Sequence, residues 1–218
     1  EFWEALPPPK AGALVLEHGV LVKARAWLNG EWSALADVSF FPDLAPAIRI
    51  TELMYHPADP SPAELAAGFG DADDFEYLEI KNVGDETVPL GGLYLANGID
   101  YTFPNVTIEP GQYLVVASNP AAFLFRYPDR AAALVDQVSG YSGHLNNAGE
   151  KIELDSPVGG VIHEFSYSDG WYSITDGDGF SLTVIDPEQS LSLWDKSKGW
   201  RRSEERRVGK ECRSRWAP

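Results

Sequence analysis

Most of the chain alternates short runs of apolar and β-branched residues with clusters of glycine, proline, asparagine and aspartate. Such runs predict strands, and the clusters predict the turns that separate them. After residue 47 the predicted strands are Ile48–Met54, Phe75–Asn82, Thr87–Leu95, Gln112–Ala117, Glu150–Asp155, Val161–Tyr167 and Phe180–Ile185. Many short strands with regular turns predict an all-β sandwich or barrel.

An earlier pair of extended runs lies within residues 20–41 and is joined at Asn29-Gly30. This dipeptide is the strongest short signal for a β-hairpin, because both of its residues accept a positive φ. The proline-containing stretch that follows predicts a linker over residues 43–47. The hairpin and the later strands are therefore expected to belong to different domains, at 1–42 and 48–201.

Two short segments interrupt the strands with helix signals. In the first, Ser61 and Glu64 have the spacing of a capping box, with Pro62 at the first helical position. In the second, Asn119 is the predicted N-cap and Pro120 follows it. Both helices are too short to be stable alone, so we expect them to pack on the sheets.

The 218 residues include 17 Lys and Arg against 33 Asp and Glu, a formal net charge of −16. This acidity argues against nucleic acid as a partner, because phosphate binding depends on clustered basic residues. No run of eighteen apolar residues occurs, so no membrane insertion is expected in this fragment. The chain begins at Glu1 without Met, and we expect it to be an internal piece of a longer polypeptide.

The last seventeen residues, 202–218, differ from the rest in composition and contain the only cysteine, Cys212. The stretch RSEERRVGKECRSRWAP resembles the translation of a common sequencing adapter and differs from it only at Ala217. Segments of this origin are excluded from functional interpretation. Without its six basic and three acidic residues, the net charge of residues 1–201 is −19.

The sequence contains no catalytic constellation. The four histidines, His18, His56, His144 and His163, are scattered and have no cysteine or second histidine at metal-ligand spacing. A glycine-rich phosphate loop with its lysine is also missing from the sequence. We therefore predict that the chain has no catalytic residues and is not an enzyme.

The stretch SDGWYSITDGDGF carries the strongest candidates for ligand binding. Asp169, Asp176 and Asp178 could supply the oxygen ligands that calcium prefers, and calcium is the only cofactor left open. Trp171 and Tyr172 could form a surface on which a sugar ring stacks. The alternative is structural: the aspartates form turns, and the aromatic side chains pack against the body of the domain.

One acidic residue is expected to lie at least partly inside the sheet. Strand alternation places Glu76 on the same face as Leu78 and Ile80. A buried carboxylate needs a partner, and the predicted partners are Arg49 and Lys81.

Five blocks of the sequence, in the same order and with similar spacing, carry a resemblance to a known family. They are IRITELMYHP (Ile48–Pro57), residues Phe75–Leu95, residues Tyr101–Phe123, residues Leu145–Asp169 and residues Ser168–Ser203. Residues 48–201 resemble a lamin tail domain of the bacterial type, which implies an immunoglobulin-like β-sandwich. The insertion Ala58–Asp74 departs from the family pattern. Residues 1–42, through VLVKARAWLNGEWS, resemble the end of a chitobiase-like or fibronectin-like module.

The resemblance also implies a function. Such domains occur in large bacterial secreted or cell-surface proteins, so an extracellular location and a non-catalytic interaction or structural role are expected. The implied partners are a protein or a cell-surface polymer, together with neighbouring domains of the same polypeptide. The rival hypothesis is an accessory module, calcium-dependent or carbohydrate-binding, that serves a neighbouring catalytic domain.

Overall fold

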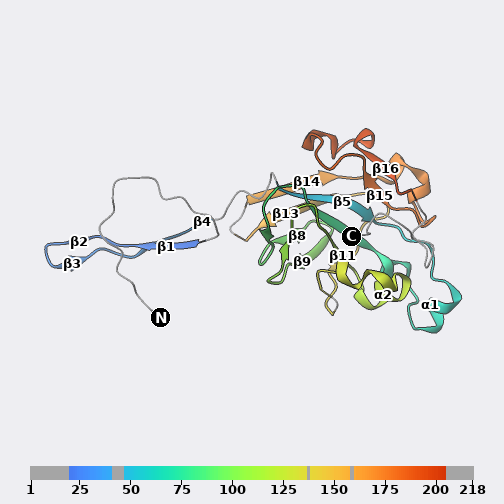
Figure 1. Cartoon of the computed structure of the whole chain (residues 1–218), viewed down its shortest axis with the longest axis horizontal. Helices are drawn as coiled ribbons and strands as arrows, with labels where there is room; N and C mark the ends of the chain where they lie inside the picture. Colours follow the sequence, from blue (N-terminus) through green and yellow to red (C-terminus); the bar gives the residue numbers. More distant parts are fainter. Residues whose placement is uncertain (1–19, 41–46, 137, 158–159, 205–218) are drawn as a thin grey trace. The chain divides into compact units, whose positions relative to one another are not determined.

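The computed structural model describes residues 20–40, 47–136, 138–157 and 160–204 (Figure 1). By its internal contacts the chain divides into two compact units, Glu1–Asp43 and Leu44–Pro218. Most of the predicted linker and residues 205–218, including Cys212, lie outside the described part. The two units are described separately.

The described part of the first unit, residues 20–40, is a β-hairpin. Its strands are β1 (Val20–Ala24), β2 (Trp27–Leu28), β3 (Glu31–Trp32) and β4 (Ala36–Phe40), with β1 paired to β4 and β2 paired to β3. The turn lies at Asn29 and Gly30, which have φ values of 52° and 88°. Positive φ at both central residues matches the right-handed twist of the flanking strands. The hairpin predicted from this dipeptide is confirmed.

The second unit contains two five-stranded antiparallel sheets. The first sheet has the order β11 (Tyr113–Ala117), β6 (Tyr77–Asn82), β5 (Ile48–Met54), β15 (Leu182–Val184) and β16 (Trp200–Arg202). The second has the order β12 (Ser142–Gly143), β9 (Ile99–Thr102), β8 (Tyr94–Ala96), β13 (Lys151–Ser156) and β14 (Gly160–Ser166). A small sheet pairs β7 (Val88–Pro89) with β10 (Thr107–Ile108). The all-β, immunoglobulin-like sandwich predicted from the sequence is confirmed.

Short helices fill the connections. They are α1 (Pro62–Ala66), α2 (Pro120–Arg126) and the 3-10 helices η1 (Ala72–Phe75), η2 (Pro128–Ala133), η3 (Asp169–Trp171), η4 (Ser173–Thr175), η5 (Leu191–Leu193) and η6 (Ser197–Gly199). The capping box of α1 forms as predicted: Glu64 N donates to Ser61 Oγ at 3.4 Å, and Ser61 N donates to Glu64 Oε2 at 2.7 Å. No helix in the described residues has the length and apolarity needed to cross a membrane.

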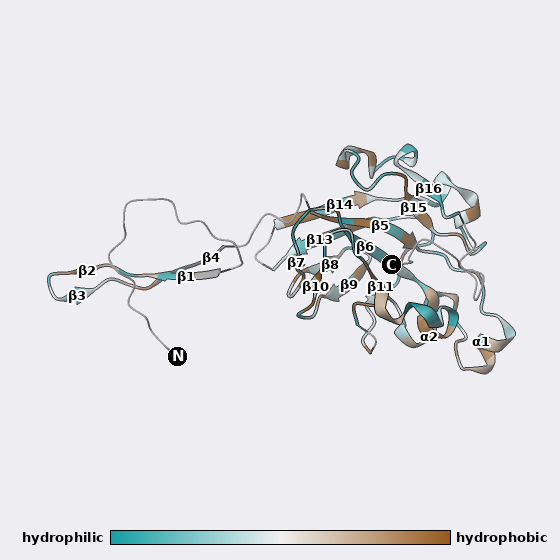
Figure 2. Cartoon of the chain, in the orientation of Figure 1, coloured by the Kyte–Doolittle hydropathy of each residue, from teal (hydrophilic) through white to brown (hydrophobic). Residues whose placement is uncertain are grey.

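The first sheet is buried on both faces. Its inner face meets the second sheet in the main core, which includes Leu53, Ile80 and Phe165. A second cluster, to which Met54 and Phe123 belong, lies where α2 and η2 cover the outer face. Polar residues are buried in this sheet as well: Thr51 Oγ1 donates to Glu79 Oε1, and Tyr77 and Ser181 donate to Glu52 Oε1. In Figure 2 the sandwich strands carry both brown, apolar stretches and teal, hydrophilic ones.

The segment that follows β15, residues 185–204, is called the closing segment, and two buried tryptophans fix it in place. Trp194 Nε1 donates to Ile50 O at 2.9 Å, and Trp200 Nε1 donates to Trp194 O at 2.8 Å. The register between β5 and β6 shifts after Ile50, where Thr51 forms a bulge. Ile50 N is bonded to His163 Nδ1, on β14 of the second sheet, at 3.2 Å. Ile50, the last paired residue before the bulge, therefore bonds through its own N–H and C=O to two other elements.

Some strand limits differ from the predicted ones. The run predicted as Thr87–Leu95 is divided into β7 and β8, because Gly92 has a φ of 83° and forms a turn between them. Strands β9, β10, β12 and β16 were not among the predicted ones. The first sheet also extends past residue 201: Arg202 pairs with Leu182, and Ser203 is buried and donates its N–H to Ser181 O at 2.8 Å.

Candidate functional site

The loop of residues 168–180, which contains all five predicted ligand-binding residues, is anchored to the end of β5. Buried Thr175 shares a hydrogen bond of 2.8 Å with the hydroxyl group of Tyr55. Gly177 N donates to His56 O at 3.1 Å. Ser168 Oγ accepts from Gly170 N at 3.2 Å and begins η3. Two bonds therefore attach the second half of the loop to the residues after β5, and the third lies within the loop.

The three aspartates of this loop differ in their described contacts and exposure. Asp176 Oδ1 lies 2.5 Å from His56 Nδ1, and Asp169 Oδ1 accepts from Gly170 N at 2.7 Å. Asp178 is exposed. Across the described ranges, no three His, Cys, Asp or Glu side chains are grouped so that they could hold a metal ion. The calcium site at Asp169, Asp176 and Asp178 stays a prediction.

The two aromatic residues of the loop are half-buried. Trp171 packs against the main core, and its ring centroid lies 6.3 Å from that of Trp200. The hydroxyl group of Tyr172 donates to Trp200 O at 2.8 Å. These contacts give both residues a packing role against the closing segment. Their use as a sugar-binding surface stays a prediction.

The pairing of His56 with Asp176 was not predicted. The side chains are partly exposed, at 32% and 41%, and the two residues are 120 positions apart in the sequence. The aspartate orients the imidazole ring by bonding one of its two nitrogen atoms. Nothing in the local pattern around either residue signals this contact, which depends on how the loop folds back onto β5.

Glu76 is fully buried, but the predicted partners, Arg49 and Lys81, were wrong. Instead, Glu76 Oε2 accepts hydrogen bonds of 2.9 Å from the hydroxyl group of Tyr141 and from Leu145 N. Glu76 precedes β6, at the C-cap of η1, so its side chain faces the segment before β13 rather than the basic residues of the first sheet. Strand alternation could not locate these distant donors.

The environment of Glu76 changes its acidity. Burial raises the pKa of this carboxyl group to about 8, although the bonds from Leu145 and Tyr141 act in the opposite direction. The charges of Asp73 and Glu150 raise the pKa further. Glu76 therefore keeps its proton at neutral pH, because water cannot solvate the ionised form inside the domain.

Exposed aromatic residues also occur in the first unit. Trp27 and Trp32 are direct cross-strand partners, with ring centroids 4.8 Å apart, and each is 55% exposed. The guanidinium group of Arg25 lies 4.4 Å from the centre of the Trp32 ring. The pair offers a flat apolar surface with one neighbouring positive charge.

Comparison with protein families gives one result that agrees with this architecture. The model of the lamin tail domain matches residues 44–169, which is more than half of the chain. The chain belongs to the lamin tail domain family. A comparison with curated proteins gives no match. Lamin tail domains of this immunoglobulin-like type are generally non-catalytic, and the family indicates a protein-interaction or structural module.

The protonated state of Glu76 generates a pH prediction for this lamin tail domain. In the unfolded chain the carboxyl group ionises near pH 4.5, whereas in the folded chain it ionises near pH 8. Between these values the folded state binds more protons than the unfolded state. The stabilisation that the protonated Glu76 contributes is therefore fully present below pH 4.5 and is lost as the pH rises towards 8. The fall should be roughly 1 kcal/mol per pH unit.

The measurement is the free energy of unfolding in urea from pH 4.5 to 8. Glu76→Gln should remove this component, because the amide cannot ionise, so the difference between variant and wild type should grow with pH. Glu86→Gln, at an exposed position, is the matched control and should leave the pH profile unchanged. Equal profiles for wild type and Glu76→Gln would show that Glu76 is ionised in the folded chain.

Proposed function

We propose that this lamin tail domain is a non-catalytic interaction or structural module of a large bacterial protein that is secreted or attached to the cell surface. It would act outside the cell and contact a protein or a surface polymer, along with neighbouring domains of its own polypeptide. The support for a bacterial and extracellular setting is the resemblance of residues 48–201 to bacterial members of the family.

The observation that carries this proposal is the filled interior of the sandwich. Large side chains, including Trp194, Trp200 and Phe165, occupy the space between the two sheets. Interiors packed in this way have few voids and leave no room for a substrate. Contacts with a partner would therefore use the outer surfaces, edges and loops, as is common for sandwich modules, where function depends on grafted surface features.

The test is retention on a surface polymer without turnover. The full chain would be mixed with purified bacterial cell walls or with bead-bound envelope proteins, pelleted, and measured in the supernatant over a range of concentrations. We expect saturable retention on one of these materials and no release of soluble sugar or peptide. A heat-unfolded sample is the control for adsorption. Release of soluble fragments, or retention equal to that of the unfolded sample on both materials, would contradict the proposal.

A second candidate is the accessory ligand-binding module that uses the loop of residues 168–180. The observation in its favour is the exposure of Asp176 and Asp178 beside the half-buried rings of Trp171 and Tyr172. A loop anchored to β5 loses little entropy when it binds a ligand, so it is suited to holding exposed groups in place. This function would serve a neighbouring catalytic domain.

Calcium offers the sharpest test of this second candidate. If the loop binds calcium, a concentration one hundred times the Kd adds about 2.7 kcal/mol to the free energy of unfolding. The measurement is a thermal melt of the full chain in millimolar calcium and then in excess chelator. Asp176→Asn with Asp178→Asn should abolish the shift, whereas Asp85→Asn, at an exposed turn position, should retain it. No shift in the wild type would remove the calcium form of this candidate.

A further inference from the structure

The helices α1 and α2, which contact each other, both expose large apolar side chains. Leu65 is 53% exposed and Phe125 is 46% exposed, and half-buried Phe69 lies with its ring centroid 5.5 Å from that of Phe125. We call these three residues the α1–α2 face. Apolar positions are visible on both helices in Figure 2. Clustered apolar side chains of this kind mark interaction sites more often than scattered ones do.

Backbone hydrogen bonds at the C-terminal end of α1 fix the position of Phe69. Phe69 N donates to Glu64 O at 3.0 Å, and Gly68 N donates to Leu65 O at 3.1 Å. With Gly68 at a φ of 97°, this is a Schellman motif, in which glycine takes the left-handed conformation after the helix. The ring of Phe69 also lies 6.0 Å from that of buried Phe75. Phe69 therefore bridges the core and the exposed Phe125.

A buried ion pair fixes α1 to α2 beneath this face. Arg126 Nε donates to Glu64 Oε1 at 2.7 Å, and both side chains are less than one-tenth exposed. The guanidinium carbon of Arg126 lies 3.4 Å from the centre of the Phe75 ring. Burial raises the pKa of Glu64, but the bonds from Arg126 and Ser61 outweigh it, so the pKa falls below its ordinary value. Separating such a pair is costly, so the α1–α2 face is rigid.

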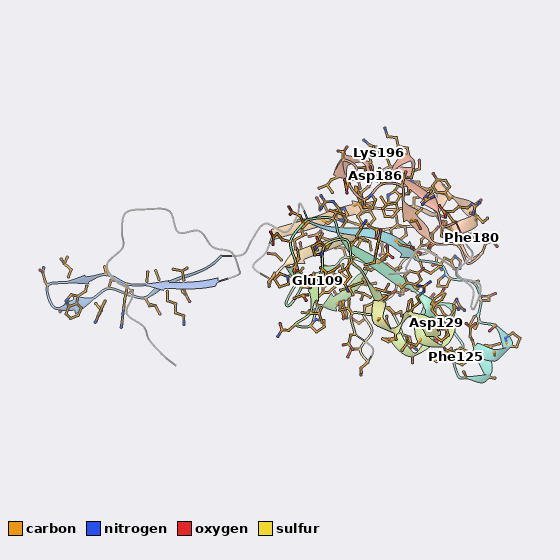
Figure 3. The ribbon with its side chains drawn as sticks, viewed as in Figure 1. Glu109, Phe125, Asp129, Phe180, Asp186 and Lys196 are labelled. Carbon is orange, nitrogen blue, oxygen red and sulfur yellow. The ribbon has the colours of Figure 1, made fainter. Side chains whose placement is uncertain are left out.

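Several acidic residues lie on segments next to the α1–α2 face. Asp71 and Asp129 are exposed, and Asp73 and Asp74 are half-buried on η1, which packs against α2. Asp74 is fixed beside the start of α2 by a 3.0 Å bond from Asn119 Nδ2. In Figure 3, Asp129 and Phe125 lie at the same corner of the domain, next to α2. An apolar centre with a charged rim is the usual composition of a protein interface.

We propose that the α1–α2 face docks a basic amphipathic segment of a partner protein. The apolar side of that segment would contact Leu65, Phe69 and Phe125, and its Lys and Arg side chains would face the acidic rim. This inference rests on the proposed function as an interaction module and assigns the surface and the chemistry of the partner. A second copy of the chain fits less well, because it would bring acidic rim against acidic rim on a chain of net charge −16.

The test uses a fluorescent synthetic helix of leucine and lysine, with the leucines on one side, as the probe. Its anisotropy is titrated with the full chain at low salt and at physiological salt. We expect saturable binding that Leu65→Ser with Phe125→Ser weakens at least tenfold. The matched control, Ile185→Ser with Leu191→Ser, changes apolar residues that are 51% and 41% exposed elsewhere, and it should stay within twofold of wild type.

Two further variants separate the rim from general acidity. Asp71→Asn with Asp129→Asn should weaken binding and reduce its salt dependence more than Asp85→Asn with Asp186→Asn, which remove exposed charges elsewhere. The single variant Leu65→Ser, in which only an exposed side chain changes, replaces the double variant if thermal melts show that the latter unfolds. A helix with the same composition but with leucines on all sides should bind more weakly.

Several results would overturn the proposal. They are the absence of saturable binding, equal losses in the α1–α2 variant and its control, and a dimer in solution that the α1–α2 variant abolishes. The last result would assign the face to a second copy of the chain. If the helix fails to bind while the cell-wall or envelope-protein assay still shows retention, only the docking surface is wrong and the proposed function stands.

Discussion

The backbone N–H and C=O of Ile50 connect the first sheet to the second sheet and to the closing segment. Ile50 pairs with Ile80 just before the bulge at Thr51, and its own N–H and C=O bond to other elements, since leaving either unpaired in a central strand would be costly. His163 from the second sheet accepts from Ile50 N, and Trp194 from the closing segment donates to Ile50 O. Because Trp194 O also accepts from Trp200 Nε1, these bonds position the last strand of the first sheet.

This arrangement explains which features the sequence could predict. Strand periodicity and turn residues identify the sandwich, the Asn29-Gly30 hairpin and the capped helix at Ser61, because each depends on residues close together in the chain. The bonds of Ile50, the partners of Glu76 and the pair of His56 with Asp176 depend on contacts between residues 65 to 144 positions apart. Residues 168–180 contain the short helices η3 and η4, and the attachment of this loop to the residues after β5 has no local signal.

Two buried glutamates of the domain show how the partner of a carboxyl group sets its charge. Glu76 and Glu64 are both buried, yet they differ in charge because Glu64 has Arg126 beside it, whereas Glu76 has only a hydroxyl and an amide donor. The pair of Glu64 and Arg126 ties the insertion at residues 58–74 to α2 and gives this lamin tail domain a rigid apolar face. A sandwich whose interior is occupied can acquire binding properties through such an addition without change to its core.

The most direct measurement is the protonation state of His163 by nitrogen NMR of the imidazole ring. Burial, and to a smaller degree the charge of Arg49, lower the pKa of His163 to about 3. The ring should therefore be neutral from pH 5 to 8, with its proton on Nε2 and Nδ1 free to accept from Ile50 N. Protonation near the ordinary pKa of about 6.5, or a proton on Nδ1, would contradict the account, because neither form could accept the Ile50 hydrogen bond.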